Sequence, residues 1–170
     1  MERPNDITLP FFAYGIFRPG QLGFFRLKDL VNDITDPSEI AGRLLLRDGL
    51  PIVDPNGHGH VTGALLSFAT REAAEQAYDR ISSLEPDLHY RWGQTAASGR
   101  SANVLWGRSP RKGSIECEED EWNGWDDPLF TSALDVVEET LHFQNQFEWD
   151  LKPLFRLQMA LAAYVLILLG

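Results

Sequence analysis

Residues 11–23 read Phe-Phe-Ala-Tyr-Gly-Ile-Phe-Arg-Pro-Gly-Gln-Leu-Gly. The apolar start of this stretch predicts a buried strand that runs into Tyr14-Gly15, and Arg18-Pro19-Gly20 predicts a turn toward a helix. Gly15 has no Cβ, so another group can approach the backbone closely there. Free amides in a turn at the end of a strand suit a carboxylate or a developing oxyanion. The stretch therefore predicts a strand followed either by an ordinary turn or by an anion-binding loop.

The composition is that of a globular protein in a reducing compartment. A length of 170 residues is enough for one domain with a core, with or without an appendage. The hydrophobic fraction of 44% argues against disorder. Cys117 is the only cysteine in the sequence, which excludes an internal disulfide. Residues 1–10 are polar and contain two prolines, unlike a secretory signal. We therefore expect a cytoplasmic protein.

The net negative charge is concentrated toward the end of the chain. Residues 1–115 carry 13 Lys/Arg and 13 Asp/Glu, whereas residues 116–170 carry 2 and 12, which accounts for the whole formal charge of −10. This break predicts a domain over 1–115, an acidic linker over 116–127 and a helical extension over 128–170. Trp122 and Trp125 leave open that the linker is instead laid against a surface. The acidic charge argues against nucleic acid as a partner.

Apolar periodicity and turn residues predict the individual elements. We expect helices over residues 21–31 and 70–84, a loop at Pro37-Ser38, a tight turn at 54–57, and strands over 7–14, 39–47, 51–53, 58–68, 89–97 and 103–106. Thr70 is expected to cap the second helix. Pro86 is expected to end it, because the residue before a proline avoids the α region.

The extension is expected to contain two helices, over residues 129–149 and 154–169. The uncharged run 159–169 is too short to span a bilayer. It either packs on a partner or belongs to a longer protein. His58 and His60 flank Gly59 in a turn without a cysteine or an acidic cluster at ligand spacing, so we expect no metal site.

Four features stand in a fixed order along the chain: Tyr14-Gly15 with the turn after it, Gly49-Leu50-Pro51, the strand Val61-Thr62-Gly63-Ala64-Leu65, and Leu84-Glu85 followed by Tyr90-Arg91. In this order and spacing, residues 7–107 resemble the γ-glutamylcyclotransferase-like superfamily, which includes the AIG2-like proteins and the γ-glutamylamine cyclotransferases. The resemblance implies an α+β fold, a small mixed β-barrel with flanking helices, to which the helical extension is added. It also implies a pocket between the Tyr-Gly turn and one acidic side chain.

The resemblance also implies roles for particular residues. The family turn usually reads Tyr-Gly-Ser/Thr-Leu and corresponds here to Tyr14-Gly15-Ile16-Phe17, whose amides would hold the glutamyl group. The family's Leu-Asp-x-x-Glu-Gly pattern corresponds to residues 81–86, Ile-Ser-Ser-Leu-Glu-Pro, which carries the catalytic glutamate over to Glu85. Tyr90 would be a pocket neighbour.

The chain departs from the family pattern at three positions. Ile16 replaces a hydroxyl residue, Ser82 replaces an aspartate and Pro86 replaces a glycine. From the residues alone, Glu85 is either a pocket group or a solvated residue closing a helix. Likewise Tyr14 is a pocket wall or core packing, Tyr90 is a pocket neighbour or a strand-face aromatic, and Arg18 is a carboxylate ligand or an ordinary surface arginine.

We therefore expect a transferase or lyase of the γ-glutamylcyclotransferase type. It would convert a small γ-glutamyl amine or peptide to 5-oxoproline, with Glu85 as general acid and base and with no metal or organic cofactor. The alternative is a non-catalytic module that binds a small ligand or regulates another protein, with residues 128–170 docking a protein partner. Self-association through the same residues is a third interpretation.

Overall fold

The computed structural model describes residues 1–47, 50–85 and 87–122. The chain divides into two units, Met1–Asn123 and Gly124–Gly170. All described residues belong to the first unit, so the two helices expected in the extension lie outside the described residues. Within the described part, none of the helices combines the length and the apolar character that crossing a membrane requires.

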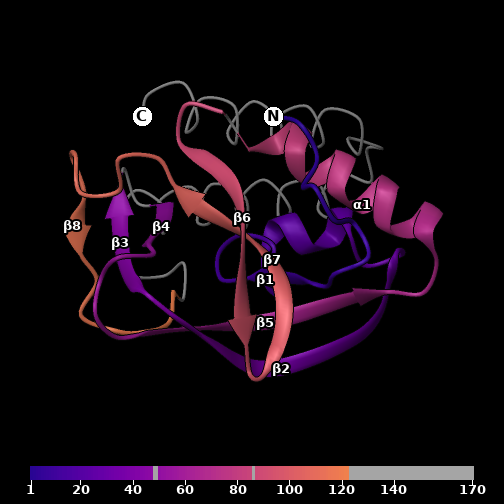
Figure 1. The fold of residues 1–170 in the computed structure, drawn as a ribbon, viewed down its shortest axis with the longest axis horizontal. Helices are drawn as coiled ribbons and strands as arrows, with labels where there is room; N and C mark the ends of the chain where they lie inside the picture. Colours follow the sequence, from indigo (N-terminus) through magenta and orange to yellow (C-terminus); the bar gives the residue numbers. More distant parts are fainter. Residues whose placement is uncertain (48–49, 86, 123–170) are drawn as a thin grey trace, which may run out of the picture. The chain divides into compact units, whose positions relative to one another are not determined.

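A closed β-barrel forms the body of the first unit (Figure 1). Its strands follow the order β1-β5-β2-β6-β7 around the barrel, where β1 is Phe11–Ala13, β2 is Val31–Ala41, β5 is His60–Phe68, β6 is Tyr90–Ala97 and β7 is Arg100–Gly107. The β1–β7 pair is parallel, and the other four neighbouring pairs are antiparallel. The predicted mixed β-barrel of an α+β fold is therefore confirmed.

The predicted helix over residues 70–84 is also confirmed. The α-helix α1 (Arg71–Leu84) begins after Thr70, whose side-chain oxygen accepts a hydrogen bond from Ala73 N at 3.1 Å. It ends because Pro86 disfavours the α conformation at Glu85, which has φ −95° and ψ 124°. The backbone of Glu85 therefore turns away from the helix axis immediately after the last helical residue.

Aromatic packing fixes α1 against the barrel. The ring of Phe11 in β1 makes edge-to-face contacts with Tyr78 of α1 and Trp92 of β6, at centroid distances of 6.5 Å and 5.8 Å. Tyr78 and Trp92 also meet edge-to-face at 5.3 Å. Aromatic pairs in this geometry add to the gain from apolar burial. The end of α1 that carries Glu85 is consequently held in a defined place beside the barrel.

A second, smaller sheet lies at the end of the barrel away from α1 (Figure 1). It has the order β4-β3-β8, with β3 at Arg43–Arg47, β4 at Leu50–Asp54 and β8 at Ile115–Glu116. The predicted turn after β4 is confirmed: Gly57 N donates to Asp54 O at 3.2 Å, and Asn56 N donates to the Asp54 carboxylate at 3.0 Å. The two-residue strand β8 was not expected from the sequence.

Residues 21–47 differ from the expectation. The predicted helix over 21–31 is only a short 3-10 helix, η1 (Leu22–Arg26), and Val31 already begins β2. The expected loop at Pro37-Ser38 lies inside β2, where the register with β5 shifts between Thr35 and Ser38. Such an irregularity tolerates a proline, which cannot donate to the ladder. Gly42, with φ +147°, separates β2 from β3, so the single strand expected over residues 39–47 is divided between them.

Residues 116–122, the first part of the predicted linker, contact the barrel unit. Thr62 N in β5 donates to Asp120 O at 2.7 Å, and Thr62 pairs with Glu121 in an isolated parallel bridge. Trp122 is only 3% exposed. The boundaries of the three predicted segments stay a prediction, because their C-terminal part lies outside the described residues.

The cap of α1 gives a stability prediction. Thr70→Ala removes the acceptor for Ala73 N and is expected to lower the free energy of unfolding by about 1 kcal/mol. Thr70→Ser keeps the hydroxyl and should retain most of that stability. Urea unfolding of both variants checks this, and equal losses in Ala and Ser would contradict the capping role.

Candidate active site

Glu85 presents a carboxyl group that is removed from water. The residue as a whole is half-buried, and burial of its carboxyl raises its pKa from the ordinary 4.5 to about 8. Among the residues that the structure describes, no hydrogen bond or ion pair to this carboxylate offsets the loss of hydration. Unpaired burial disfavours the charged form of a carboxyl group. Glu85 is therefore mostly protonated at neutral pH in the absence of a ligand.

Tyr14 and Tyr90 lie beside Glu85. Both are buried, at 4% and 5% exposure. Burial, and after it the charge of Glu85, raises the pKa of each phenol well above 10. The Tyr14 hydroxyl donates to Leu105 O at 2.6 Å, and the Tyr90 hydroxyl donates to Pro51 O at 2.9 Å. The structure thus brings three weak acids together, and all three favour their protonated forms.

The loop that follows Tyr14 has occupied carbonyls and unoccupied amides. Gly15 O accepts a hydrogen bond from Arg18 N at 2.9 Å, and Ile16 O accepts one from Phe24 N at 3.2 Å. Within the described ranges, the amides of Gly15, Ile16 and Phe17 donate no backbone hydrogen bond. We call residues 14–17 the cradle loop. Its arrangement leaves backbone donors available, as an anion-binding turn requires.

Close packing holds the cradle loop in place. A Cβ added to Gly15 would lie 2.6 Å from Pro51 Cγ, closer than real Cβ contacts come, so the proline ring packs directly on the glycine backbone. The ring of Phe17 is 3% exposed and meets Phe11 edge-to-face at 5.9 Å. Pro51 also accepts the hydrogen bond of Tyr90, so it links the cradle loop to the second tyrosine.

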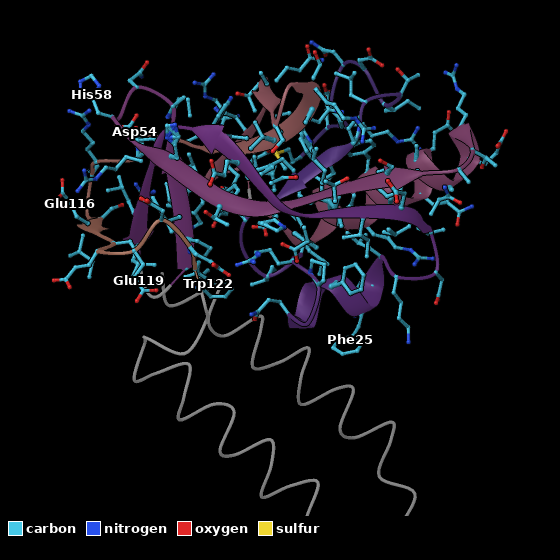
Figure 2. All side chains as sticks on the ribbon, turned by 90° about the horizontal axis from the view of Figure 1, so that it is seen from below. Phe25, Asp54, His58, Glu116, Glu119 and Trp122 are labelled. Carbon is cyan, nitrogen blue, oxygen red and sulfur yellow. The ribbon has the colours of Figure 1, made fainter. Side chains whose placement is uncertain are left out.

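The other residues considered from the sequence lie elsewhere or have other partners. The Arg18 side chain is 12% exposed and faces acids of its own chain, Glu121 and Asp36. Asp54, which lines an open surface hollow, is bound by Arg111 at 2.7 Å, and it lies with His58 at the end of the unit that holds the small sheet (Figure 2). That hollow shares no residue with the cluster of Glu85, Tyr14 and Tyr90.

In the part of the chain that the structure describes, no group of three or more His, Cys, Asp or Glu side chains is placed to hold a metal ion.

No family model and no curated protein matches the chain, but solved structures do. An uncharacterised protein from Pyrococcus horikoshii, PH0828, is similar with a TM-score of 0.50 and 23% identity, over 64% of this chain and 86% of that one. The uropathogenic E. coli-specific protein c4763 is similar with a TM-score of 0.51 and 12% identity, over 69% and 94% of the two chains.

A third similar structure is a variant of the allophanate hydrolase of Kluyveromyces lactis. The TM-score is 0.50 and the identity 11%, over 72% of this chain but only 21% of that one. At these identities the likeness concerns the fold alone. The chain therefore shares a small barrel fold with PH0828 and c4763.

The buried carboxyl predicts how stability changes with pH. Folding raises the pKa of Glu85 from 4.5 to about 8, so the folded protein binds the proton more tightly than the unfolded chain. Wild-type protein therefore loses stability as the pH rises from about 4.5 to about 8. Glu85→Gln lacks this loss. The free energy of unfolding of the variant relative to wild type should rise by a few kcal/mol between about pH 5 and about pH 9, since one pKa unit corresponds to about 1.4 kcal/mol.

Denaturant unfolding at the two pH values measures this difference. Glu72→Gln, which changes an exposed glutamate of α1, is the matched control for the loss of a carboxylate that is not buried. A difference between Glu85→Gln and wild type that does not change with pH would show that the carboxyl of Glu85 is hydrated in the folded protein.

The contact between Gly15 and Pro51 gives a second prediction. Gly15→Ala forces the new methyl group into the proline ring, so the cradle loop must shift. We expect a loss of about 1 to 3 kcal/mol in the free energy of unfolding. Gly15→Ala combined with Pro51→Ala, which removes the opposing ring, should recover part of the loss. Additive effects of the two substitutions would contradict the contact.

Proposed function

We propose that the protein is a γ-glutamylcyclotransferase-like enzyme, which cyclises a γ-glutamyl amine or peptide to 5-oxoproline and releases an amine. The observation that carries the proposal is the buried carboxyl of Glu85 with a pKa of about 8, next to the tyrosine that begins a loop with free amides. Perturbed carboxyl groups of this kind are concentrated at catalytic sites. The motifs that resemble the superfamily fall on the same residues.

The proposed reaction must remove two protons from the substrate α-amine and deliver one to the leaving amine. The α-amine of the substrate, with an ordinary pKa of about 8, must lose a proton before it attacks its own γ-carbonyl carbon. Glu85, as the carboxylate, accepts that proton, and attack by the free amine forms the C–N bond that closes the ring. Glu85 gives the proton to the leaving nitrogen as its C–N bond breaks, and the carboxylate then accepts the second proton from the ring nitrogen, which leaves the neutral ring amide of 5-oxoproline. Because the pKa of Glu85 is also about 8, transfer between the two groups costs little free energy in either direction.

The cradle loop has the electrostatic role in this proposal. Attack on the γ-carbonyl places negative charge on its oxygen, which the amides of Gly15, Ile16 and Phe17 would stabilise. Ile16 supplies no hydroxyl, so residues 15–17 of this loop would act through the main chain only. The hydroxyl groups of Tyr14 and Tyr90 donate to backbone carbonyls. The Tyr90 oxygen keeps lone pairs that could accept from the substrate ammonium, whereas the Tyr14 oxygen is also hydrogen-bonded to the backbone of Val53.

A second candidate function is ligand binding without turnover, and particular residues favour it. Ser82, which stands where the family pattern has an aspartate, is committed to structure: its hydroxyl accepts from Trp92 Nε1 at 3.2 Å and donates to Glu2 O at 3.3 Å. Ile16 removes one side-chain contact to substrate. In this alternative the same cluster holds a small γ-glutamyl compound, and residues 128–170 recruit a protein partner.

Product formation separates the two candidates. We expect wild-type protein to release 5-oxoproline from at least one member of a panel of γ-glutamyl amines and dipeptides. Its kcat/KM should be highest near pH 8, because one proton must be shared between Glu85 and the substrate amine. Glu85→Gln should lower kcat by about 100-fold to 10,000-fold, whereas Glu72→Gln should leave it unchanged.

The contrary results are equally specific. Binding of a γ-glutamyl compound by wild-type protein with no 5-oxoproline formed would establish the non-catalytic alternative. Equal activity in wild type and Glu85→Gln would remove Glu85 from the mechanism.

A further inference from the structure

Arg18 is joined to two segments of the chain at once. Through its backbone it belongs to the cradle region, because its N–H donates to Gly15 O at 2.9 Å. Its side chain points to residues 117–122, which we call the strap. Arg18 Nη1 lies 2.6 Å from Glu121 Oε1 and 3.4 Å from Trp122 O. A single residue thus connects the proposed oxyanion loop to a segment about a hundred positions away.

The strap is itself fixed to both sheets. Cys117 N donates to Leu44 O in β3 at 3.3 Å, and Asp120 O accepts from Thr62 N in β5 at 2.7 Å. Glu121 follows directly and pairs with Thr62 in a parallel bridge. The buried Trp122 is the last described residue and lies at the lower side of the unit in Figure 2. Glu121 therefore holds Arg18 from a position set by backbone contacts.

The burial of Arg18 makes its acidic partners necessary. The side chain is 12% exposed, and its Nε is buried without a hydrogen-bond partner among the described residues. Its remaining acidic neighbour, Asp36, lies 3.8 Å from Nη2. Breaking a buried pair by removing one member leaves an uncompensated charge, which the structure relieves by moving. If Glu121 lost its charge, Arg18 would shift toward water, and the turn that begins at Gly15 would shift with it.

We infer that Arg18 is a positioning residue, which uses its ion pair with Glu121 to hold the cradle loop in the conformation that exposes its amides. This inference rests on the proposed function for its catalytic part, but not for its structural part. Arg18 is not expected to bind the substrate carboxylate, because its guanidinium is already directed at acids of its own chain. Its influence on the reaction would pass through the geometry of Gly15 to Phe17.

The structural part is tested without any substrate by residue-resolved amide hydrogen exchange. Glu121→Gln should accelerate exchange at Arg18 N by about tenfold or more, because this amide donates to Gly15 O of the loop. Phe24 N is not used as a reporter, because it donates to Gln21 O at 3.1 Å as well as to Ile16 O at 3.2 Å. Exchange at Asn103 N, which donates to Pro10 O in the barrel, should not change. Glu118→Gln, an exposed glutamate on the same strap, is the matched control. Unchanged exchange at Arg18 N in Glu121→Gln would overturn the inference.

The catalytic part is tested with whichever substrate wild-type protein turns over. Glu121→Gln, which would loosen the oxyanion loop, should lower kcat by about 10-fold to 100-fold relative to wild type. Its KM should change by less than about twofold, because misplaced amides weaken binding of the transition state more than binding of the substrate. Glu121→Asp should restore part of kcat. A higher KM with unchanged kcat would instead make Arg18 a substrate ligand and overturn the inference. If wild-type protein has no activity, the proposed function fails, and the exchange experiment alone decides the positioning role.

Discussion

The burial of one unpaired carboxyl group is the constraint on which the rest of the site depends. The carboxyl of Glu85 has lost hydration without gaining an ion pair among the described residues. This burial disfavours the charged carboxylate and raises the pKa of Glu85 to about 8. Stability alone would favour an apolar side chain at such a position. A buried carboxyl beside two protonated phenols is expected where the protein needs a group that can take up and release a proton near neutral pH.

The fold keeps this group in place through contacts that are short and specific. Proline at position 86 turns the backbone of Glu85 out of α1, and the ring of Phe11 holds α1 against the barrel. The hydroxyl of Tyr14 is bonded to β7, and that of Tyr90 is bonded to Pro51 of β4. Tyr90 of β6 therefore joins the barrel to the smaller sheet, so the surroundings of Glu85 draw on both sheets.

The sequence predicted those structural features that depend only on residues close together along the chain. Thr70 as a cap, Pro86 as a stop and the turn at Asp54 were all confirmed, because each acts within four positions along the chain. The strand over residues 31–38 was missed because its polar side chains are exposed on β2, which is held by pairing with the distant β5. The two-residue β8 and the Thr62–Glu121 bridge carry no periodic signal at all.

The candidate site shows the same division. Spacing alone did not connect Glu85 with Tyr14; the resemblance to a family did, and the structure brings the two residues together. The packing of Pro51 on Gly15 and the ion pair of Arg18 with Glu121 join residues that are far apart in the sequence. No local pattern predicts them, because they form only when the chain has folded. The roles of Glu85, Tyr90 and the cradle loop in catalysis stay predictions.

The most direct measurement of the central claim is the titration of the Glu85 side-chain carboxyl by ¹³C NMR, with Glu85→Gln used to assign the signal. The account predicts a midpoint near pH 8 in the protein without ligand. A midpoint close to the ordinary 4.5 would contradict it, because the carboxyl would then be hydrated and unsuited to exchange a proton with an amine near neutral pH.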